Sequence, residues 1–252
     1  MAYALSIIMP CYKGETFIEN SIKAVEEEVS FFEENFELTV VIDGFVDDGY
    51  NKAKTLEQIY ENLKVIGYER NKGKGYAIQY GFRQSQGESI VFLDSDLDYH
   101  PRTLQGFLKI IREEDADLVI GNRKDKTSIF HYPFLRKLAS WGFNLYVSSI
   151  FPELDVQDCQ AGIKMITKEA AQRIFRYLES QKGAETFIFD VYLLLAARKY
   201  GFKVIQAPCV FETKGSTIGV GRKFLQSALR MGIDVWRLKQ DIRKSDDDVS
   251  QD

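Results

Sequence analysis

The sequence predicts an α/β fold in which helices cover both faces of a mostly parallel β-sheet. Over the first half of the chain, short apolar runs alternate with segments whose apolar residues recur at helical spacing. Strands that alternate with helices in this way are joined by crossovers and pair in parallel. Acidic or glycine-containing segments directly follow several of the apolar runs, at the edge of an open α/β sheet where ligands bind.

The first half supplies this alternation in order. Each predicted strand is a short apolar run closed by Pro, Gly or Asp, and these runs span residues 3–9, 38–42, 64–67, 90–93 and 118–120. The segments between them place apolar side chains three or four positions apart, as on one face of a helix, around residues 18–29, 53–59, 77–82 and 104–111. The predicted order is therefore β-α-β-α-β-α-β-α-β.

The alternation breaks after Gly121. Three further helices and a strand are expected, in that order, at residues 129–149, 168–178, 187–200 and 203–207. The first of these stretches is rich in aromatic residues. A last helix is expected at 222–244, and the polar, acidic end at 245–252 is expected to be frayed.

The composition is that of a soluble globular protein, and it gives no electrostatic case for nucleic acid as a partner. The chain has 252 residues, of which 45% are hydrophobic and 28% charged, and its net charge is −4. Cys11, Cys159 and Cys209 lack metal-type spacing and are odd in number, so we expect a reducing, cytoplasmic setting. No apolar run approaches the length of a membrane span, so membrane contact is expected only at the surface.

Residues 89–101 hold the most informative stretch, an apolar run that ends in carboxylates. Asp94, Asp96 and Asp98 are two positions apart, so they would share one face and one pocket if the extended chain continued. Carboxylate oxygens of this kind suit Mg²⁺ or Mn²⁺, with substrate phosphate completing the coordination. The alternative is a polar turn in which Asp98 or His100 caps the next helix.

Three other segments follow predicted strands and could bind a nucleotide. Asp43 could accept hydrogen bonds from a base or ribose, or be a turn residue before Gly44. Tyr12 could stack on a base or simply pack. The glycine-lysine loop at residues 70–75 favours a phosphate, although it is not a P-loop. No G-x-G-x-x-G follows the first strand, which makes a dehydrogenase a poor hypothesis.

Together, these segments form an ordered set of motifs. They are Pro10-x-Tyr12, Ile42-Asp43-Gly44, Asn71-Lys72-Gly73-Lys74-Gly75 and Asp94-Ser95-Asp96. In this order they resemble the inverting glycosyltransferases of family 2. The resemblance implies the GT-A (Rossmann-like) fold and an Asp-x-Asp that binds a divalent ion on the donor diphosphate. It implies a domain at 1–215, with a nucleotide-sugar half at 1–121 and an acceptor half at 122–215, followed by a C-terminal segment at 216–252.

The second half narrows the resemblance. Asp158-Cys159-Gln160-Ala161-Gly162 and Phe189-Asp190-Val191 resemble stretches of dolichyl-phosphate glucosyltransferases, and Arg123, Arg136 and Ser140 are similar to the acceptor-phosphate set of dolichyl-phosphate mannose synthases. The resemblance implies transfer of a hexose from a nucleotide sugar to a polyisoprenyl (dolichyl) phosphate. UDP-glucose is favoured as the donor over GDP-mannose.

The resemblance also implies roles for individual residues. The metal ligands would be Asp94, Asp96 and Asp98. The residues implied in catalysis are Asp96, Asp158 and Asp190, of which the last two could instead bind sugar hydroxyls. The residues implied in binding the donor or the acceptor are Pro10, Tyr12, Glu15, Asp43, Lys72, Lys74, Ser95, Arg123, Arg136, Ser140, Gln160 and Lys214.

Departures from the family pattern leave the donor open. The usual Asp-Asp-Gly-Ser reads Ile42-Asp43-Gly44-Phe45 here, and the usual Glu after Phe189-Asp190-Val191 is Tyr192. Two alternatives stay open, namely a family 2 enzyme with a soluble glycan acceptor and a non-catalytic nucleotide-sugar-binding protein. A processive polysaccharide synthase is disfavoured because Gln-x-x-Arg-Trp is absent.

Residues 222–244 are basic and amphipathic and contain Trp236, a pattern suited to an anionic membrane surface. A helix packed on its own domain with a solvated face is the alternative. The apolar positions expected on one side of this helix are Phe224, Leu225, Ala228, Leu229, Val235, Trp236 and Ile242. A lipid-linked acceptor would place the protein at the cytoplasmic face of a membrane, with or without a separate membrane-anchor subunit.

Overall fold

A computed structural model describes residues 3–131, 134–181, 183–186, 188–212 and 222–249. Within 130–140, 222–228 and 243–249 it describes the course of the backbone only.

A seven-stranded sheet forms the centre of the molecule, in the order β3-β2-β1-β4-β7-β5-β8. Its strands are β1 (Leu5–Cys11), β2 (Phe36–Asp43), β3 (Leu63–Tyr68), β4 (Ser89–Leu93), β5 (Leu118–Asn122), β7 (Ile163–Thr167) and β8 (Val204–Pro208). All pairings are parallel except those of β7, which runs antiparallel between β4 and β5. A second, two-stranded sheet joins β6 (Ile129–His131) to β9 (Val210–Glu212).

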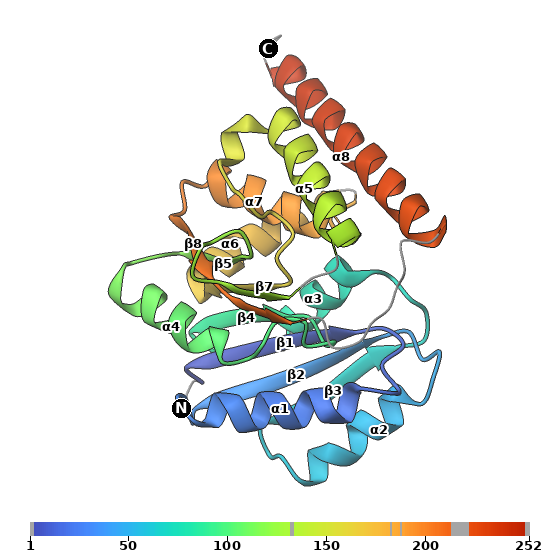
Figure 1. Cartoon of the computed structure of the whole chain (residues 1–252), viewed down its shortest axis with the longest axis vertical. Helices are drawn as coiled ribbons and strands as arrows, with labels where there is room; N and C mark the ends of the chain where they lie inside the picture. Colours follow the sequence, from blue (N-terminus) through green and yellow to red (C-terminus); the bar gives the residue numbers. More distant parts are fainter. Residues whose placement is uncertain (1–2, 132–133, 182, 187, 213–221, 250–252) are drawn as a thin grey trace.

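Helices cover both faces of the sheet, and Figure 1 shows α1 and α2 on one side of strands β1, β2 and β3 and α3 on the other. One face carries α1 (Ile18–Ser30), α2 (Gly49–Thr55) and α4 (Thr103–Glu113), and the other carries α3 (Lys74–Phe82), α6 (Lys168–Leu178) and α7 (Phe189–Lys199). Beyond the second face lie α5 (Phe134–Ile150) and α8 (Arg222–Val249), which pack on each other. Short 3₁₀ turns follow α2 and α5 at Leu56–Gln58 and Pro152–Leu154.

The buried strand β4 shows how the core is divided. Its side chains alternate, so Val91 and Leu93 enter the cluster under α1 and α4, whereas Ile90 and Phe92 enter the cluster under α3, α6 and α7. Each fully buried side chain of this kind contributes about 1.5–3 kcal/mol relative to exposure. The mostly parallel sheet with two helical layers confirms the predicted α/β class.

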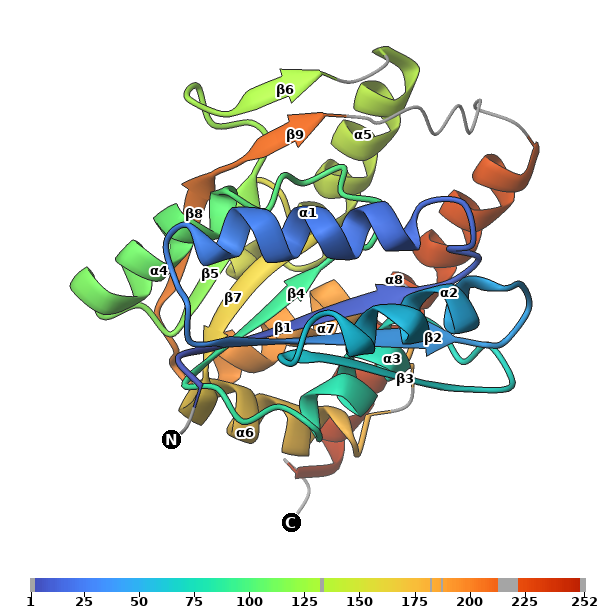
Figure 2. The ribbon, with the colours of Figure 1, turned by 90° about the horizontal axis from the view of Figure 1, so that it is seen from below.

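The strand order reverses between β1 and β4, and this reversal positions the site. From β1 the chain proceeds outward to β2 and β3, then crosses back to β4 on the other side of β1. The carboxyl ends of the two strands therefore flank a topological switch point, where open α/β sheets bind ligands. Cys11 and Asp94 stand at these ends. In Figure 2 both strands point toward the same edge of the molecule.

Three predictions of secondary structure were wrong in detail. Residues 129–131 form β6, so the aromatic-rich segment is helical only from Phe134. Strands β7 and β9 were not predicted, because β7 carries a lysine in its middle and β9 is only three residues long. The last helix continues to Val249, beyond the predicted end at 244. No helix in the described part of the chain is long and apolar enough to cross a membrane.

Candidate active site

The acidic segment after β4 is a tight turn and not a continuation of the strand. Leu97 adopts a left-handed φ of 52°, and its N–H donates to the Asp94 carbonyl at 3.2 Å. The Asp98 N–H donates to Asp96 Oδ1 at 3.1 Å. The Asp96 side chain is exposed whereas that of Asp98 is buried, so the three carboxylates do not share one face. The prediction that Asp94, Asp96 and Asp98 point into one pocket was therefore wrong.

The turn agrees in part with the alternative hypothesis. His100 Nδ1 accepts from the Arg102 N–H at 3.3 Å just before α4 begins. Among the described residues, no group of three Asp, Glu, His or Cys side chains is arranged to hold a metal ion. The turn still crowds negative charge, and partial desolvation, together with the charges of Asp94 and Asp98, raises the pKa of Asp96 to about 6. The raised pKa of Asp96 shows that negative charge is concentrated at this turn.

Lys74 joins the glycine-lysine loop to the acidic turn. It lies in the first turn of α3, and its Nζ contacts Asp94 Oδ1 at 2.7 Å. Burial by itself lowers the pKa of Lys74, but the carboxylates of Asp94 and Asp190 outweigh it and raise the pKa well above its ordinary value. Lys72 points elsewhere, since its Nζ bonds the Tyr76 hydroxyl at 3.0 Å and lies 4.2 Å from the centre of that ring. The structure brings only one of the two predicted phosphate lysines to the acidic turn.

Asp43 holds the glycine-lysine loop in place. Its buried carboxylate accepts from Asn71 Nδ2 at 2.8 Å, from the Lys72 N–H at 2.7 Å and from the Gly73 N–H at 3.0 Å. Gly73 has a φ of +100°, and a Cβ there would lie 2.7 Å from the Glu185 carbonyl oxygen. These contacts fix the N-terminus of α3 beside the acidic turn. Contact between Asp43 and a base or ribose stays a prediction.

The end of β1 carries the other residues predicted to meet the nucleotide. Pro10 lies within β1. Tyr12 directly follows the strand and is 46% exposed, so its ring is accessible for stacking on a base. The Glu15 side chain lies on the exposed side of this edge, 3.6 Å from Lys52 Nζ. Ser95 hydrogen-bonds to the Cys11 thiol, whose pKa burial raises to about 12. This bond ties the acidic turn to β1 across the switch point.

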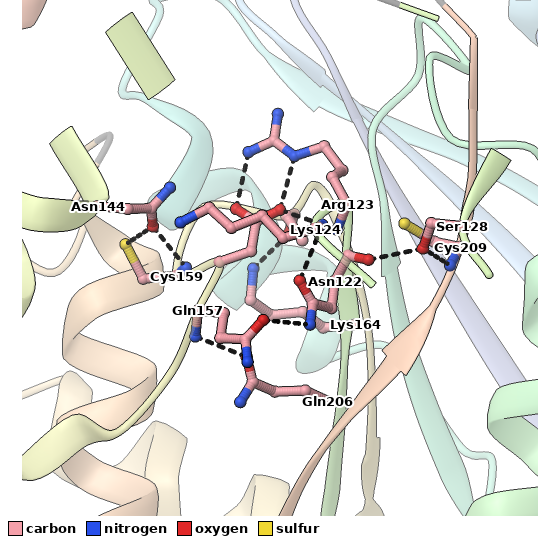
Figure 3. A network of polar contacts seen from close by, with 12 residues as sticks. Asn122, Arg123, Lys124, Ser128, Asn144, Gln157, Cys159, Lys164, Gln206 and Cys209 are labelled. Atoms are coloured by element: carbon pink, nitrogen blue, oxygen red, sulfur yellow. Dashed lines mark hydrogen bonds and ion pairs between the residues drawn. The ribbon is translucent and has the colours of Figure 1, made fainter. Parts of the chain in front are cut away.

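A buried ion pair joins Asp158 to Arg123 (Figure 3). Arg123 Nε donates to Oδ2 at 2.6 Å, Nη2 donates to Oδ1 at 2.7 Å, and the Arg123 backbone N–H donates to Oδ2 at 3.2 Å. The Arg123 side chain is only 10% exposed and the Asp158 side chain only 1%. Burial alone would raise the pKa of Asp158, but the hydrogen bonds and charge of Arg123 hold it below its ordinary value.

A second buried ion pair, between Lys164 and Asp190, was not predicted. Lys164 Nζ lies 2.6 Å from Asp190 Oδ1 and also donates to the Ala161 carbonyl. The lysine projects from β7, and its side chain is 2% exposed. A lysine in the middle of a buried strand is the signal that could have identified it, because buried charges require a partner.

The neighbour of Ala161 connects this pair to the acidic turn. The Asp94 N–H donates to the Gly162 carbonyl at 3.0 Å. A Cβ at Gly162 would lie 2.0 Å from Asp94 Oδ2, so any larger residue there would displace the Asp94 carboxylate. The antiparallel pairing of β4 with β7, which places Leu93 opposite Ile163, therefore lays the second-half motif against the first-half motif.

Polar side chains brace the segment that carries Asp158 (Figure 3). Asn122 Nδ2 donates to Gln157 Oε1 at 3.2 Å, and the Gln157 N–H donates to Gln206 Oε1 at 2.7 Å. Asn144 of α5 accepts from the Cys159 N–H at 2.9 Å. The segment is thereby fixed to β5, β8 and α5 at once.

The remaining predicted residues are less closely defined. Gln160 is half-buried in the turn that leads to β7. Arg136 and Ser140 lie in α5 where only the backbone is described, and Lys214 lies outside the described residues. Their predicted contacts with the acceptor or the donor stay predictions.

Comparison with known proteins agrees with this architecture. Glycosyltransferase AglD of Haloferax volcanii is 26% identical over 233 residues, which cover 88% of this chain and 36% of that protein. Dolichyl-phosphate beta-glucosyltransferase of Dictyostelium discoideum is 25% identical over 264 residues, 93% of this chain and 77% of that protein. The chain thus spans only about a third of the first relative.

A solved structure shares the fold of this chain. Glucosyl-3-phosphoglycerate synthase from Mycobacterium tuberculosis, in complex with Mn²⁺, UDP and glucosyl-3-phosphoglycerate, superposes with a TM-score of 0.69 at 19% identity, over 94% of this chain and 80% of that one. This likeness confirms the predicted GT-A fold. Residues 6–175, well over half of the chain, match the family model described as Glycosyl transferase family 2. The chain therefore belongs to that family.

Proposed function

We propose that this protein transfers a hexose, with inversion, from a nucleotide sugar to a polyisoprenyl phosphate. The observation that carries the proposal is the contact of Gly162 with Asp94, which brings the donor and acceptor motifs to one place. The Dictyostelium relative, named for dolichyl-phosphate glucosylation, supports the lipid phosphate as acceptor and UDP-glucose over GDP-mannose as donor.

We propose Mg²⁺ or Mn²⁺ as the cofactor. The mycobacterial neighbour has been solved with Mn²⁺ and UDP-glucose. The side chains at the switch point fit such an ion, because Asp94 and Asp96 offer hard carboxylate oxygens as ligands. Asp94 and Asp96 would hold the ion with the donor diphosphate as a further ligand, and Asp98, which is buried, would support the turn. When bound, the ion stabilises negative charge on the leaving diphosphate, and Lys74 adds to this from α3.

A transfer assay tests this function. Purified protein is incubated with Mn²⁺ or Mg²⁺, a short polyprenyl phosphate and radiolabelled UDP-glucose or GDP-mannose in separate reactions. We expect UDP-glucose label in the organic phase and a loss of at least 100-fold in Asp96→Asn. The control is Asp115→Asn, which makes the same chemical change on an exposed turn before β5. Metal-dependent donor binding without label in any lipid would contradict the proposal and favour a soluble acceptor or a non-catalytic binder.

We further propose that the protein works at the cytoplasmic face of a membrane, on a surface formed by α5 and α8. Tyr146 of α5 donates to the Gly232 carbonyl of α8 at 2.9 Å, which fixes the two helices together. Their outward apolar side chains form what we call the α5–α8 surface: Trp141, Leu145, Leu229, Ile233 and Trp236. Exposed aromatic and apolar residues on helices of this kind suit the interfacial region of a bilayer.

The α5–α8 surface differs from the predicted one. Val235 and Trp236 were expected on the same side of the helix, but Val235 is buried against the core and Trp236 is 54% exposed. The described part of α8 therefore has two apolar sides, one packed on the domain and one facing outward. The burial of Val235 agrees with a helix packed on its own domain, and contact of the outward side with a membrane stays a prediction. A separate membrane subunit stays a prediction.

Vesicle sedimentation tests the surface. We expect the double variant Trp141→Ser/Trp236→Ser to bind vesicles containing phosphatidylglycerol at least tenfold more weakly than the parent. The matched control is Phe31→Ser/Ile59→Ser, which removes two exposed apolar side chains from the α1 and α2 side of the sheet. Equal losses in both double variants, or no loss in either, would contradict the assignment.

A further inference from the structure

We propose that Asp158 and Asp190 are positioning residues, each held in its charged form by a buried cation, and that the site takes an acceptor whose attacking oxygen is already ionised. The proposal deepens the proposed function and rests on it. It gives Lys164 a role that the sequence did not reveal.

Asp158 has no geometry for removing a proton from an acceptor. A general base must come within hydrogen-bond reach of the proton that it takes. Both carboxylate oxygens of Asp158 already accept from Arg123, at 2.6 and 2.7 Å, and the side chain is 1% exposed. Protonation would break a bidentate ion pair and leave the Arg123 charge buried without its counter-charge. What Asp158 does is fix the plane of the Arg123 guanidinium, the group proposed to meet the acceptor phosphate.

Asp190 is also paired with a buried cation, through one of its carboxylate oxygens. It stands in the first turn of α7, and its Oδ1 lies 2.6 Å from Lys164 Nζ. Its negative charge also stabilises the Lys74 ammonium. Uptake of a proton by Asp190 would remove the counter-charge of Lys164 in a buried position. Proton uptake by Asp190 at each turnover would therefore repeatedly break its ion pair with Lys164.

The Asp190–Lys164 pair acts instead on the backbone under the acidic turn. Lys164 donates to the Ala161 carbonyl, and the next residue, Gly162, accepts from the Asp94 N–H. A chain of contacts therefore runs from Asp190 through Lys164 and residues 161–162 to Asp94. We infer that this chain sets the position of Asp94, and through it that of the donor diphosphate.

A site of this kind can transfer the sugar to an acceptor phosphate without a general base. An oxygen of the acceptor phosphate supplies the electron pair that forms the new bond to the anomeric carbon. The bond from that carbon to the β-phosphate oxygen of the donor breaks, and its electron pair leaves with the nucleoside diphosphate. No proton moves, because a phosphate monoester has a second pKa of about 6 and is largely a dianion at neutral pH. A hydroxyl acceptor would have to lose a proton that neither carboxylate can take.

The test compares Asp190→Asn with the double variant Lys164→Gln/Asp190→Asn, which replaces the ion pair by two neutral amides. Asp190→Asn alone leaves the Lys164 charge buried and unpaired, so we expect it to lose activity and stability together. The double variant restores charge balance, and we expect it to recover to at least about a tenth of the parental kcat with polyprenyl phosphate. Loss of a general base would cost about 10²–10⁴-fold in both variants, without recovery.

Two further measurements distinguish a loss of catalysis from a loss of folding or of donor binding. Thermal unfolding and metal-dependent donor binding show whether each variant is folded and loaded. The pH profile of kcat/KM should keep the same acidic limb, near the second pKa of the acceptor phosphate at about 6, in the parent and the double variant. A folded, donor-binding double variant that stays inactive, or that loses this limb, would overturn the inference while the proposed function stands.

The parent protein supplies the remaining comparison. Incubated with polyprenyl phosphate and with the corresponding free alcohol, it should glycosylate only the phosphate. Transfer to the alcohol would overturn the inference, because it requires a base. Transfer to neither lipid would remove the proposed function, and the inference would fall with it.

Discussion

At the scale of single residues, Gly162 is where the two halves of the site touch. A Cβ at this position would lie 2.0 Å from Asp94 Oδ2 and 3.1 Å from the Tyr99 ring. The carboxylate of Asp94 is also the partner of Lys74. A side chain at Gly162 must therefore displace a group that the proposed function places on the donor diphosphate.

Gly162→Ala is expected to lower kcat/KM by about 100-fold, since a displacement of about 1 Å in a reacting group can cost that much. The control is Gly106→Ala on the exposed side of α4, where an added Cβ has no neighbour within 4 Å. That control should keep full activity and gain up to about 1 kcal/mol of stability, because alanine favours a helix over glycine. Normal kinetics in Gly162→Ala would show that Asp94 need not keep this position.

Glu26 gives a prediction about stability and pH. It is buried on α1, its Oε2 accepts from Asn62 at 3.0 Å, and its Oε1 has no hydrogen-bond partner among the described residues. Burial raises the pKa of Glu26 above its ordinary value. The charged form is therefore the destabilising one, and its cost is absent at low pH and grows as the pH rises through the unfolded-state pKa of about 4.3.

Glu26→Gln should accordingly raise the free energy of unfolding by about 1–3 kcal/mol at pH 7, because it removes a buried charge while the amide oxygen can still accept from Asn62, and by less at pH 4. Urea unfolding at the two pH values measures this difference. Glu27→Gln, at the exposed neighbouring position, serves as the control and should change little at either pH. A stability gain of Glu26→Gln that does not depend on pH would contradict the assignment.

The positions and partners of single side chains are the features that the sequence predicts least completely. Alternation along an extended chain predicted one face for Asp94, Asp96 and Asp98, but the positive φ of Leu97 ends the strand geometry between them. A hydrophobic pattern does not predict a left-handed backbone conformation of this kind. The partners of Asp158 and Asp190 were equally hidden, because Arg123 and Lys164 lie 35 and 26 positions away in the chain.

At the scale of elements, the segment before β7 depends on α5 for its position. Asn144 Oδ1 accepts from both the Cys159 N–H and the Cys159 thiol, beside the Arg123–Asp158 pair. Burial raises the pKa of the Cys159 thiol to about 12, so this thiol remains a neutral donor. The contact transmits the position of α5 to the proposed acceptor site.

Asn144→Ala should destabilise the protein by about 1–3 kcal/mol, because it leaves a buried N–H unpaired. We also expect a higher KM for the acceptor with a smaller change in KM for the donor. Ser149→Ala removes an exposed hydroxyl from the same helix and serves as the control. Equal changes in both KM values would contradict a local effect on the acceptor side.

The parallel strands could be predicted because each is a short apolar run, and β1, β2, β4 and β5 are buried on both faces. The same rule failed for β7, where Lys164 interrupts the run, and for the short strands β6 and β9, whose pairing depends on residues about 80 positions apart. Local pattern thus identified the elements within residues 1–121 well. The elements after residue 121 depend more on contacts between distant segments, which pattern alone does not contain.

At the scale of the whole molecule, one edge of the sheet gathers the segments to which the proposed function assigns donor binding and the motif before β7. The acidic turn, α3 with Lys74 and the motif before β7 meet at the switch point between β1 and β4. The α5–α8 surface lies on two helices that pack on each other, α5 within residues 122–215 and α8 in the C-terminal segment, as Figure 1 shows. A lipid acceptor held at a bilayer would meet a water-soluble donor in such an arrangement.

The central claim is that the product is an inverted hexosyl phosphate, and nuclear magnetic resonance of the isolated lipid product tests it most directly. From α-linked UDP-glucose we predict a β-anomer whose anomeric carbon is joined to phosphorus, seen as carbon–phosphorus coupling at that carbon. An α-anomer would contradict inversion. A sugar joined to a carbon-bound hydroxyl, without coupling to phosphorus, would contradict the phosphate acceptor and the account of the site built upon it.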